Sequence, residues 1–125
     1  MTAALIIEDN ENNLELIRFI LEQANYTTCF AMTGLDGVRQ ALADAPDFVI
    51  LDIQLPDING MEVLKRIRAH PAGEKIPIIA MTSYAMSGDK HKLLAAGCNG
   101  YIEKPIDPMV VVDQIKQVLD EKRAS

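Results

Sequence analysis

The sequence predicts a doubly wound α/β fold, a five-stranded parallel sheet of order 2-1-3-4-5 with helices on both faces. The first observation behind this prediction is a repeat of five apolar runs, each followed by an amphipathic segment, with runs that begin near residues 4, 27, 48, 76 and 100. Helical connections of this length imply parallel strands joined by right-handed crossovers. The second observation is that the run at 27–31 is more polar than the others, which suits an edge strand.

The first half of the chain contains two strand-helix units. Apolar residues at 4–7 predict a buried strand, and Asn10 or Asn12 could cap the helix that follows. The inner face of that helix is predicted from the spacing of Leu14, Ile17, Leu21 and Ala24. After the polar strand at 27–31, a second helix is predicted over 34–44. Its inner face is expected to consist of Leu35, Val38 and Leu42.

The run at 48–51 is predicted to be the central strand. It is continuously apolar and partly β-branched, the pattern of a strand that is buried on both faces, and Asp52 ends it. Pro56 and the pair Asn59-Gly60 then predict a turn, which leaves Asp52 at the carboxyl end of the strand. In open α/β sheets, ligands bind at that edge.

The second half begins with a helix over 61–70, whose outer face is expected to be basic through Lys65, Arg66 and Arg68. A buried strand is predicted at 76–81, closed by Thr82. A helix from Ser87 or Gly88 to about residue 96 should follow, with Gly97 in the position of a C-terminal cap.

A short fifth strand is predicted at 100–103, directly before Lys104-Pro105. The last helix is expected to start near Pro108, because proline is accepted in a first turn. Its inner face is predicted from Val112, Ile115 and Leu119.

Composition narrows the class of protein. Residues 1–125 suit one globular domain, with 49% hydrophobic and 24% charged residues. No apolar run approaches the roughly 20 residues that span a membrane, and no leader precedes the first strand, so we expect a cytoplasmic protein without membrane contact. The net charge of −6 disfavours direct binding to nucleic acid. Cys29 and Cys98 are too few for a disulfide framework or a zinc site, and are expected to be buried, reduced thiols.

Four of the five predicted strands end in a chemically useful side chain. Strand 2 is the exception, which agrees with its place at the edge in the flavodoxin-like order, away from the switch point between strands 1 and 3. The side chains at the other four strand ends are Glu8 and Asp9, Asp52, Thr82, and Lys104.

Three carboxylates that meet at one edge would repel one another unless a cation lay among them. Oxygen ligands without His or Cys suit Mg²⁺, for which Mn²⁺ could substitute, and make zinc improbable. A carboxylate such as Asp52 can also act as a nucleophile toward phosphorus. Phosphoryl transfer then requires positioning and neutralisation of charge, to which Lys104 and Thr82 could contribute.

Each of these residues also has an ordinary interpretation when taken alone. An Asp after a strand is most often a turn former or a helix cap, an acidic pair is usually solvated, and a Lys before Pro is usually a surface lysine. The combination favours a functional site, because all of these residues fall at the ends of strands in one predicted sheet.

The motifs that carry a family resemblance are Glu8-Asp9-Asn10, the segment 50–60 around Asp52, Met81-Thr82-Ser83, and the segment 101–105 around Lys104. Together and in this order they resemble the receiver domain of two-component response regulators, the CheY-like family. The resemblance covers essentially the whole chain. Within the family, the sequences of these motifs are most similar to those of stand-alone receivers of the DivK type and of receivers of hybrid histidine kinases.

This resemblance implies that Asp52 accepts a phosphoryl group from a histidine kinase or a histidine phosphotransfer protein. Glu8, Asp9, Asp52 and the backbone carbonyl of Gln54 would hold Mg²⁺. The chain would then be a phosphoacceptor signalling domain rather than an enzyme, assisting only its own phosphorylation and dephosphorylation.

The resemblance also implies how the signal would leave the domain. Thr82 and Lys104 would contact the phosphoryl group, and Tyr101 would be the aromatic switch that turns inward as Thr82 moves. The switching surface would comprise helix 4, strand 5 and helix 5, and would control a downstream effector protein through a population shift. The expected oligomeric state is a monomer or a weak homodimer.

Three other interpretations remain. A degenerate receiver would act as a phosphorylation-independent interaction module, although the intact acidic pair, Thr82 and Lys104 argue against it. A haloacid-dehalogenase-type phosphatase expects a second Asp two residues after the nucleophile, where this chain has Gln54. A flavodoxin-type protein expects a loop rich in Ser, Thr and Gly after strand 1, where the acidic run at 8–13 would repel a phosphate.

Overall fold

The computed structural model, which describes residues 2–83 and 87–124, contains the five parallel strands that the sequence predicts, in the order β2-β1-β3-β4-β5. The strands are β1 (Ala3–Ile7), β2 (Thr27–Ala31), β3 (Phe48–Asp52), β4 (Ile78–Thr82) and β5 (Gly100–Glu103). The helices are α1 (Glu11–Gln23), α2 (Gly34–Asp44), α3 (Gly60–Ala69), α4 (Ser87–Ala95) and α5 (Val111–Ala124), with a short 3₁₀ turn at Pro71–Gly73. The predicted fold class is confirmed.

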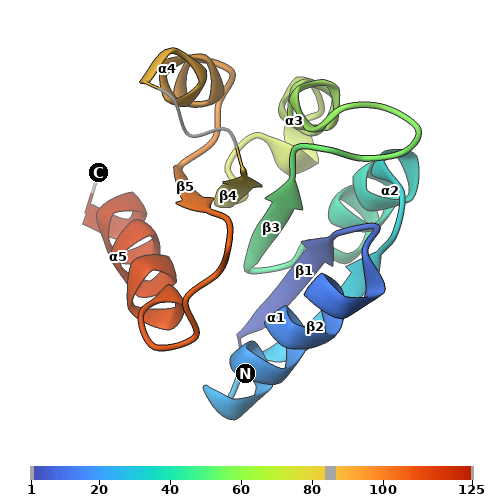
Figure 1. Ribbon diagram of the computed structural model, residues 1–125. Coiled ribbons are helices and arrows are strands. Elements are labelled where there is room, and N and C mark those ends of the chain that lie inside the picture. The colour runs from blue at the N-terminus through green and yellow to red at the C-terminus, as the bar shows by residue number, and fades with distance from the viewer. Residues whose placement is uncertain (1, 84–86, 125) are drawn as a thin grey trace.

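Helices cover both faces of the sheet, as Figure 1 shows. Alternate side chains of each strand point to opposite faces. Ala4 and Ile6 of β1 therefore join the apolar cluster beneath α1 and α5, whereas Leu5 and Ile7 join the cluster beneath α2, α3 and α4. Both clusters run through the fully buried strands β3 and β4, so the sheet forms the middle layer of the domain.

Helix α2 packs on the sheet through different residues from those predicted. Leu35 is 49% exposed, so the predicted inner face is wrong at that position. The buried positions of α2 are small, namely Gly34, Gly37 and Ala41. A Cβ atom at Gly37 would lie 2.5 Å from Cδ1 of Ile7. The helix therefore approaches β1 more closely than a leucine face would allow.

Several boundaries differ from the prediction by a few residues. Helix α1 is capped by Asn10, whose side chain accepts a hydrogen bond from the Asn13 amide. Strand β4 begins at Ile78, two residues later than predicted, and it includes Thr82. Helix α5 begins at Val111 rather than near Pro108. Val111 is buried, and Val112, which we predicted for the inner face, is partly buried and packs against the same apolar cluster. Gly97 has a φ of 113° after α4, in agreement with its predicted capping role.

The edge position predicted for β2 is confirmed. Phe30 of this strand is 41% exposed, and the guanidinium of Arg18 lies 5.1 Å from the centre of its ring. The side-chain amide of Gln40 donates a hydrogen bond of 2.9 Å to the Phe30 carbonyl. A backbone acceptor on β2 is thus bonded from within the chain.

Arg68 binds backbone at the amino ends of β4 and β5 and does not belong to the basic outer face predicted for α3. Its Nη1 donates to the carbonyls of Gly73 (2.8 Å) and Ile76 (2.7 Å), and its Nη2 donates to the Gly97 carbonyl (2.8 Å). Nη2 also donates to Oδ1 of Asn99, which in turn accepts from the amide of Ile78. These bonds tie α3 to the segments that enter both strands.

Both cysteines are free thiols. Cys98 is buried as predicted, whereas Cys29 is only partly buried because it lies on the edge strand. Among the described residues, none of the helices has the length and apolar character that a membrane span requires.

Candidate functional site

Polar side chains gather at the carboxyl edge of the sheet, where the sequence placed them. Asp52 is the last residue of β3 and is 3% exposed, and Thr82 is the last residue of β4 and is 4% exposed. Met81 is the register partner of Asp52, so Thr82 lies one residue beyond it on the neighbouring strand. Glu8 follows β1 and Lys104 follows β5. The parallel topology therefore brings four strand ends to one place.

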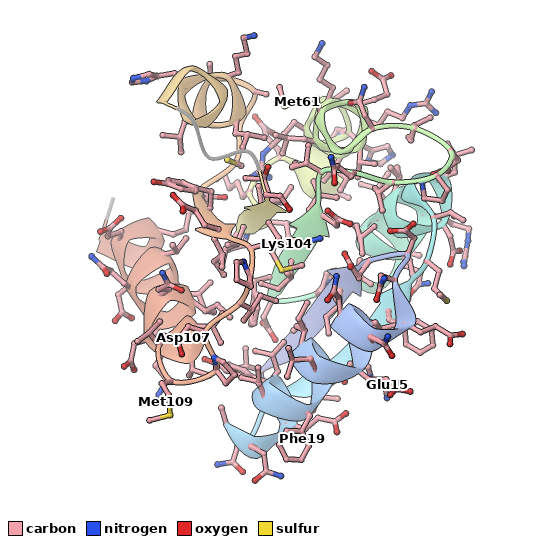
Figure 2. The ribbon with its side chains drawn as sticks, viewed as in Figure 1. Glu15, Phe19, Met61, Lys104, Asp107 and Met109 are labelled. Atoms are coloured by element: carbon pink, nitrogen blue, oxygen red, sulfur yellow. The ribbon has the colours of Figure 1, made fainter. Side chains whose placement is uncertain are left out.

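Lys104 supplies the positive charge of this site. Its Nζ lies 3.2 Å from Oδ1 of Asp52 and 3.6 Å from Oε1 of Glu8. Figure 2 shows the lysine extending from the segment after β5 toward β1 and β3. The Lys104-Pro105 peptide bond is cis, and the Lys104 amide donates to the Thr82 carbonyl at 2.9 Å. The ammonium thus bridges two buried carboxylates.

Glu8 is fully buried and incompletely bonded. Its Oε1 accepts a hydrogen bond of 3.0 Å from the side chain of Asn13, but among the described residues nothing donates to its buried Oε2. Burial, together with the neighbouring Asp52 carboxylate, raises the pKa of Glu8 to about 7, against the opposing effects of Asn13 and Lys104. An acid held in this way favours a proton or a cation beside it.

Glu8, Asp9 and Asp52 form a cluster that fits a metal ion. One carboxylate oxygen from each lies within 4.8 Å of the others, and Asp9 is exposed, so the cluster opens to solvent. A cation bound there would supply the partner that the buried Oε2 of Glu8 lacks among the described residues. An all-oxygen donor set of this size suits a hard divalent cation that keeps some of its water, which describes Mg²⁺ better than Zn²⁺.

Gln54 lies beside this cluster in the loop after β3. Its backbone amide donates to Oδ1 of Asp52 at 3.1 Å, which fixes the first turn of the loop against the carboxylate. The predicted role of its carbonyl as a metal ligand stays a prediction. Asn13 is the residue that the sequence analysis missed at this site. The feature of the sequence that could have identified Asn13 is its position in the first turn of the helix that follows Glu8.

Tyr101 lies away from the cluster, on β5. It is partly buried and packs against the apolar cluster beneath α2, α3 and α4. It also lines a cavity of about 640 Å³ bounded by α4, β5 and α5. The cavity wall combines apolar residues such as Leu94 and Val110 with the acidic residues Glu103 and Asp107. This is the surface that the sequence analysis named as the switching surface.

A second cavity, of about 360 Å³, opens beside Lys104. It lies between α1 and the segment that leads into α5, and it is lined by Asn13, Leu16, Ser83, Lys104, Pro105 and Ile106. The lysine therefore has carboxylates on one side and an open space on the other.

The fold and the site together define a doubly wound α/β protein with an acidic cluster that fits a cation, a buried carboxylate and a bridging lysine at the carboxyl edge of its sheet. The response regulator receiver domain model matches residues 4–116. The chain belongs to this family, whose members are signalling modules of two-component systems. Receiver domains bind Mg²⁺ at an acidic site and interact with histidine kinases, phosphotransfer proteins and effectors.

The chain is also similar to individual members of this family. It is 37% identical to the polar-differentiation response regulator DivK of Brucella ovis over 119 residues, which cover 95% of this chain and 97% of that protein. A putative response regulator from Chloroflexus aurantiacus superposes with a TM-score of 0.89 at 31% identity, covering 95% of this chain and 98% of that one.

A third relative was crystallised with the metal. The receiver domain of a sensor histidine kinase from Pseudomonas aeruginosa, with a magnesium ion coordinated in its active-site cleft, superposes with a TM-score of 0.84. It is 31% identical, and the match covers 99% of this chain and 98% of that domain.

Proposed function

We propose that Asp52 accepts a phosphoryl group from the phosphohistidine of a histidine kinase or a histidine phosphotransfer protein, and that the whole of residues 1–125 acts as one phosphorylation-controlled switch. The observation that carries this proposal is the buried Asp52 carboxylate at the end of β3, with Nζ of Lys104 3.2 Å away and the carboxylates of Glu8 and Asp9 beside it. We further propose that the chain works in the cytoplasm, where it would meet such a phosphohistidine donor.

The proposed reaction is an in-line displacement at phosphorus. An oxygen of Asp52 forms a bond to phosphorus while the bond from phosphorus to the donor imidazole nitrogen breaks, and the electron pair of that bond stays with the imidazole. Lys104 already contacts Asp52, so its ammonium is placed to neutralise charge on the transferred group. The Thr82 hydroxyl, one residue beyond the register partner of Asp52, would donate to a phosphoryl oxygen.

Glu8, Asp9, Asp52 and the Gln54 carbonyl would hold Mg²⁺, with Mn²⁺ as a substitute. Bound there, the ion neutralises negative charge on the carboxylates and on the incoming phosphoryl oxygens. The chain itself contributes the placement. Burial of Glu8 and Asp52 keeps two of the ligands fixed, and the exposed Asp9 leaves an approach for the phosphodonor.

The proposed output surface is the one formed by α4, β5 and α5. Tyr101 on this surface is separated from Thr82 by the β4-β5 ladder, in which Thr82 pairs with Glu103, two residues further along β5. A phosphoryl group that draws Thr82 toward it would favour the conformer in which Tyr101 turns inward, by the difference in its interaction with the two conformers. A downstream effector protein would read the change, with the chain as a monomer or a weak homodimer.

The test is the intact mass after incubation with acetyl phosphate, with and without Mg²⁺. We expect a Mg²⁺-dependent gain of about 80 Da, one HPO₃ group, in the wild-type chain and in Asp113→Asn, a matched change on the surface of α5, but not in Asp52→Asn. Absence of the gain could also reflect rapid hydrolysis, so beryllofluoride binding is measured in parallel. Failure of both assays would overturn the proposed switch and favour an interaction module that works without phosphorylation.

A further inference from the structure

The loop between β3 and α3, residues 53–59, is held at both of its ends. At its start, the Ile53 amide donates to the Met81 carbonyl and the Gln54 amide donates to Asp52. At its end, the Gly60 amide donates to the Ile53 carbonyl at 2.8 Å, and a Cβ atom at Gly60 would lie 2.6 Å from Cα of Ile53. The loop is therefore closed tightly on itself beside the phosphoacceptor.

Between these ends, the loop is attached to a different helix by Asp57. Oδ1 of Asp57 accepts from the Gly34 amide at 2.7 Å, and Oδ2 accepts from the Leu35 amide at 2.9 Å. Gly34 and Leu35 are the first two residues of α2, whose amides have no partner within the helix. A single carboxylate thus satisfies two of these amides from 22 and 23 residues away in the chain.

Two further observations show that this contact is specific. The amides of Leu35 and Gly34 hold the pKa of Asp57 at about 2, so the carboxylate is charged throughout the neutral range. Ile58 packs so closely that a Cβ atom at Gly34 would lie 2.7 Å from its Cγ1. The absence of a side chain at Gly34 therefore allows the loop to seat on the start of α2.

We propose that Asp57 is a positioning residue for the metal site: by binding the first two amides of α2, it holds the loop so that the Gln54 carbonyl faces the cluster of Glu8, Asp9 and Asp52. This inference rests on the proposed function, which assigns that carbonyl to Mg²⁺. Asp57 is not one of the proposed metal ligands, because both of its carboxylate oxygens bind the start of α2. Its effect on the site passes through the backbone of the two residues, Leu55 and Pro56, that lie between Gln54 and itself.

The matched control is Thr33, because it caps the same helix without reaching the loop. Oγ1 of Thr33 accepts from the Asp36 amide at 3.2 Å. Removing either cap weakens the start of α2. Only the removal of Asp57 also releases residues 53–59, so the two variants separate a general loss of helix stability from a loss of loop position.

The experiment measures Mg²⁺ affinity by titrating MgCl₂ into ¹⁵N-labelled protein and following backbone amide shifts. We expect Asp57→Ala to raise the dissociation constant for Mg²⁺ at least threefold and Thr33→Ala to change it by less than 1.5-fold. Asp57→Asn keeps one oxygen acceptor and should fall between Asp57→Ala and the wild type. At saturating Mg²⁺, Asp57→Ala should gain the phosphoryl group at a rate within about twofold of wild type, because its reacting groups are intact.

A second readout needs no metal. Hydrogen exchange of the amides in 53–59 should accelerate in Asp57→Ala but not in Thr33→Ala. Equal Mg²⁺ affinity in Asp57→Ala and wild type, equal weakening in both variants, or no Mg²⁺ binding by the wild-type chain would overturn the inference. Mg²⁺ binding by the wild-type chain with neither a phosphoryl gain nor beryllofluoride binding would instead overturn the proposed function, while the comparison of Asp57→Ala with Thr33→Ala would still decide the role of Asp57.

Discussion

The two ends of the sheet differ in how completely a buried charged side chain is hydrogen-bonded. At the amino ends of β4 and β5, the half-buried guanidinium of Arg68 donates to the carbonyls of Gly73, Ile76 and Gly97 and to the side chain of Asn99. At the carboxyl edge, the fully buried Glu8 has one bonded oxygen and one oxygen to which no described residue donates.

This difference separates what holds the fold together from what is open to a ligand. A buried charge that is fully hydrogen-bonded stabilises its surroundings, and an incompletely bonded one costs free energy until a partner arrives. The amino end is therefore complete in the isolated chain. The carboxyl edge becomes complete only when a proton or a cation joins the carboxylates, which is the behaviour expected of a binding site.

The largest effect that would test this comparison is at the amino end. We expect Arg68→Ala to lower the free energy of unfolding by about 3 kcal/mol, because several buried carbonyls lose their donor at once. Urea denaturation followed by circular dichroism measures it.

The control for that measurement lies two residues away on the same helix. Arg66 is exposed, and within residues 2–83 and 87–124 its ion-pair partner is Glu62 at 3.2 Å. Arg66→Ala should therefore change the free energy of unfolding by less than about 1 kcal/mol. If the two arginine variants lost equal stability, the hydrogen bonds of Arg68 would not be what stabilises the amino end of the sheet.

An intermediate effect is expected in the pH dependence of the metal-free protein. The pKa of Glu8 is raised from 4.5 to about 7, so the folded state binds this proton more tightly than the unfolded state. The associated stability is fully present below pH 4.5 and is lost as the pH rises to about 7. Between pH 5 and pH 8 the loss should be about 2 kcal/mol.

Urea denaturation at a series of pH values, in the presence of a chelator, measures this loss. Glu8→Gln serves as the comparison, because its side chain cannot titrate while the other titrating groups are unchanged. The difference between the wild-type and Glu8→Gln curves isolates the effect of Glu8. Parallel curves across this pH range would contradict the incomplete hydrogen bonding that we assign to Glu8 at the carboxyl edge.

The smallest effect sharpens the comparison by completing the open end. At pH 8, Mg²⁺ at ten times its dissociation constant should raise the free energy of unfolding of the wild-type chain by about 1.4 kcal/mol. The same concentration should stabilise Glu8→Gln less, because a charged ligand is missing. NaCl at matched ionic strength controls for screening. Equal stabilisation by both salts would show that the gain in stability does not come from Mg²⁺ binding at this site.

The fold and most of the candidate site could be predicted from local patterns. Apolar runs predict buried strands, and the polar residue that ends each run marks the functional edge, so the positions of Asp52, Thr82 and Lys104 followed from the sequence. Leu35 could not be placed correctly, because helical spacing does not reveal that Gly37 lets α2 approach β1 closely, or that Gly34 lets it approach the loop before α3.

The contacts of Arg68 and Asp57 could not be predicted for a different reason. Most of their partners are backbone groups, which have no signature in the sequence, and several of these lie in segments distant along the chain. Gly97 lies 29 residues from Arg68, and Gly34 lies 23 residues from Asp57. Only the assembled sheet brings these segments within hydrogen-bonding distance.

The hydrogen bond from Gln40 to the Phe30 carbonyl has a consequence for how molecules of this protein meet one another. Strand β2 is the outermost strand on its side of the sheet, and an open strand edge is a template for pairing with a strand of another molecule. The Gln40 amide already occupies one of the acceptors that such a strand would need. At the high protein concentrations of a crowded cell, this bond lowers the tendency of β2 to start aggregation.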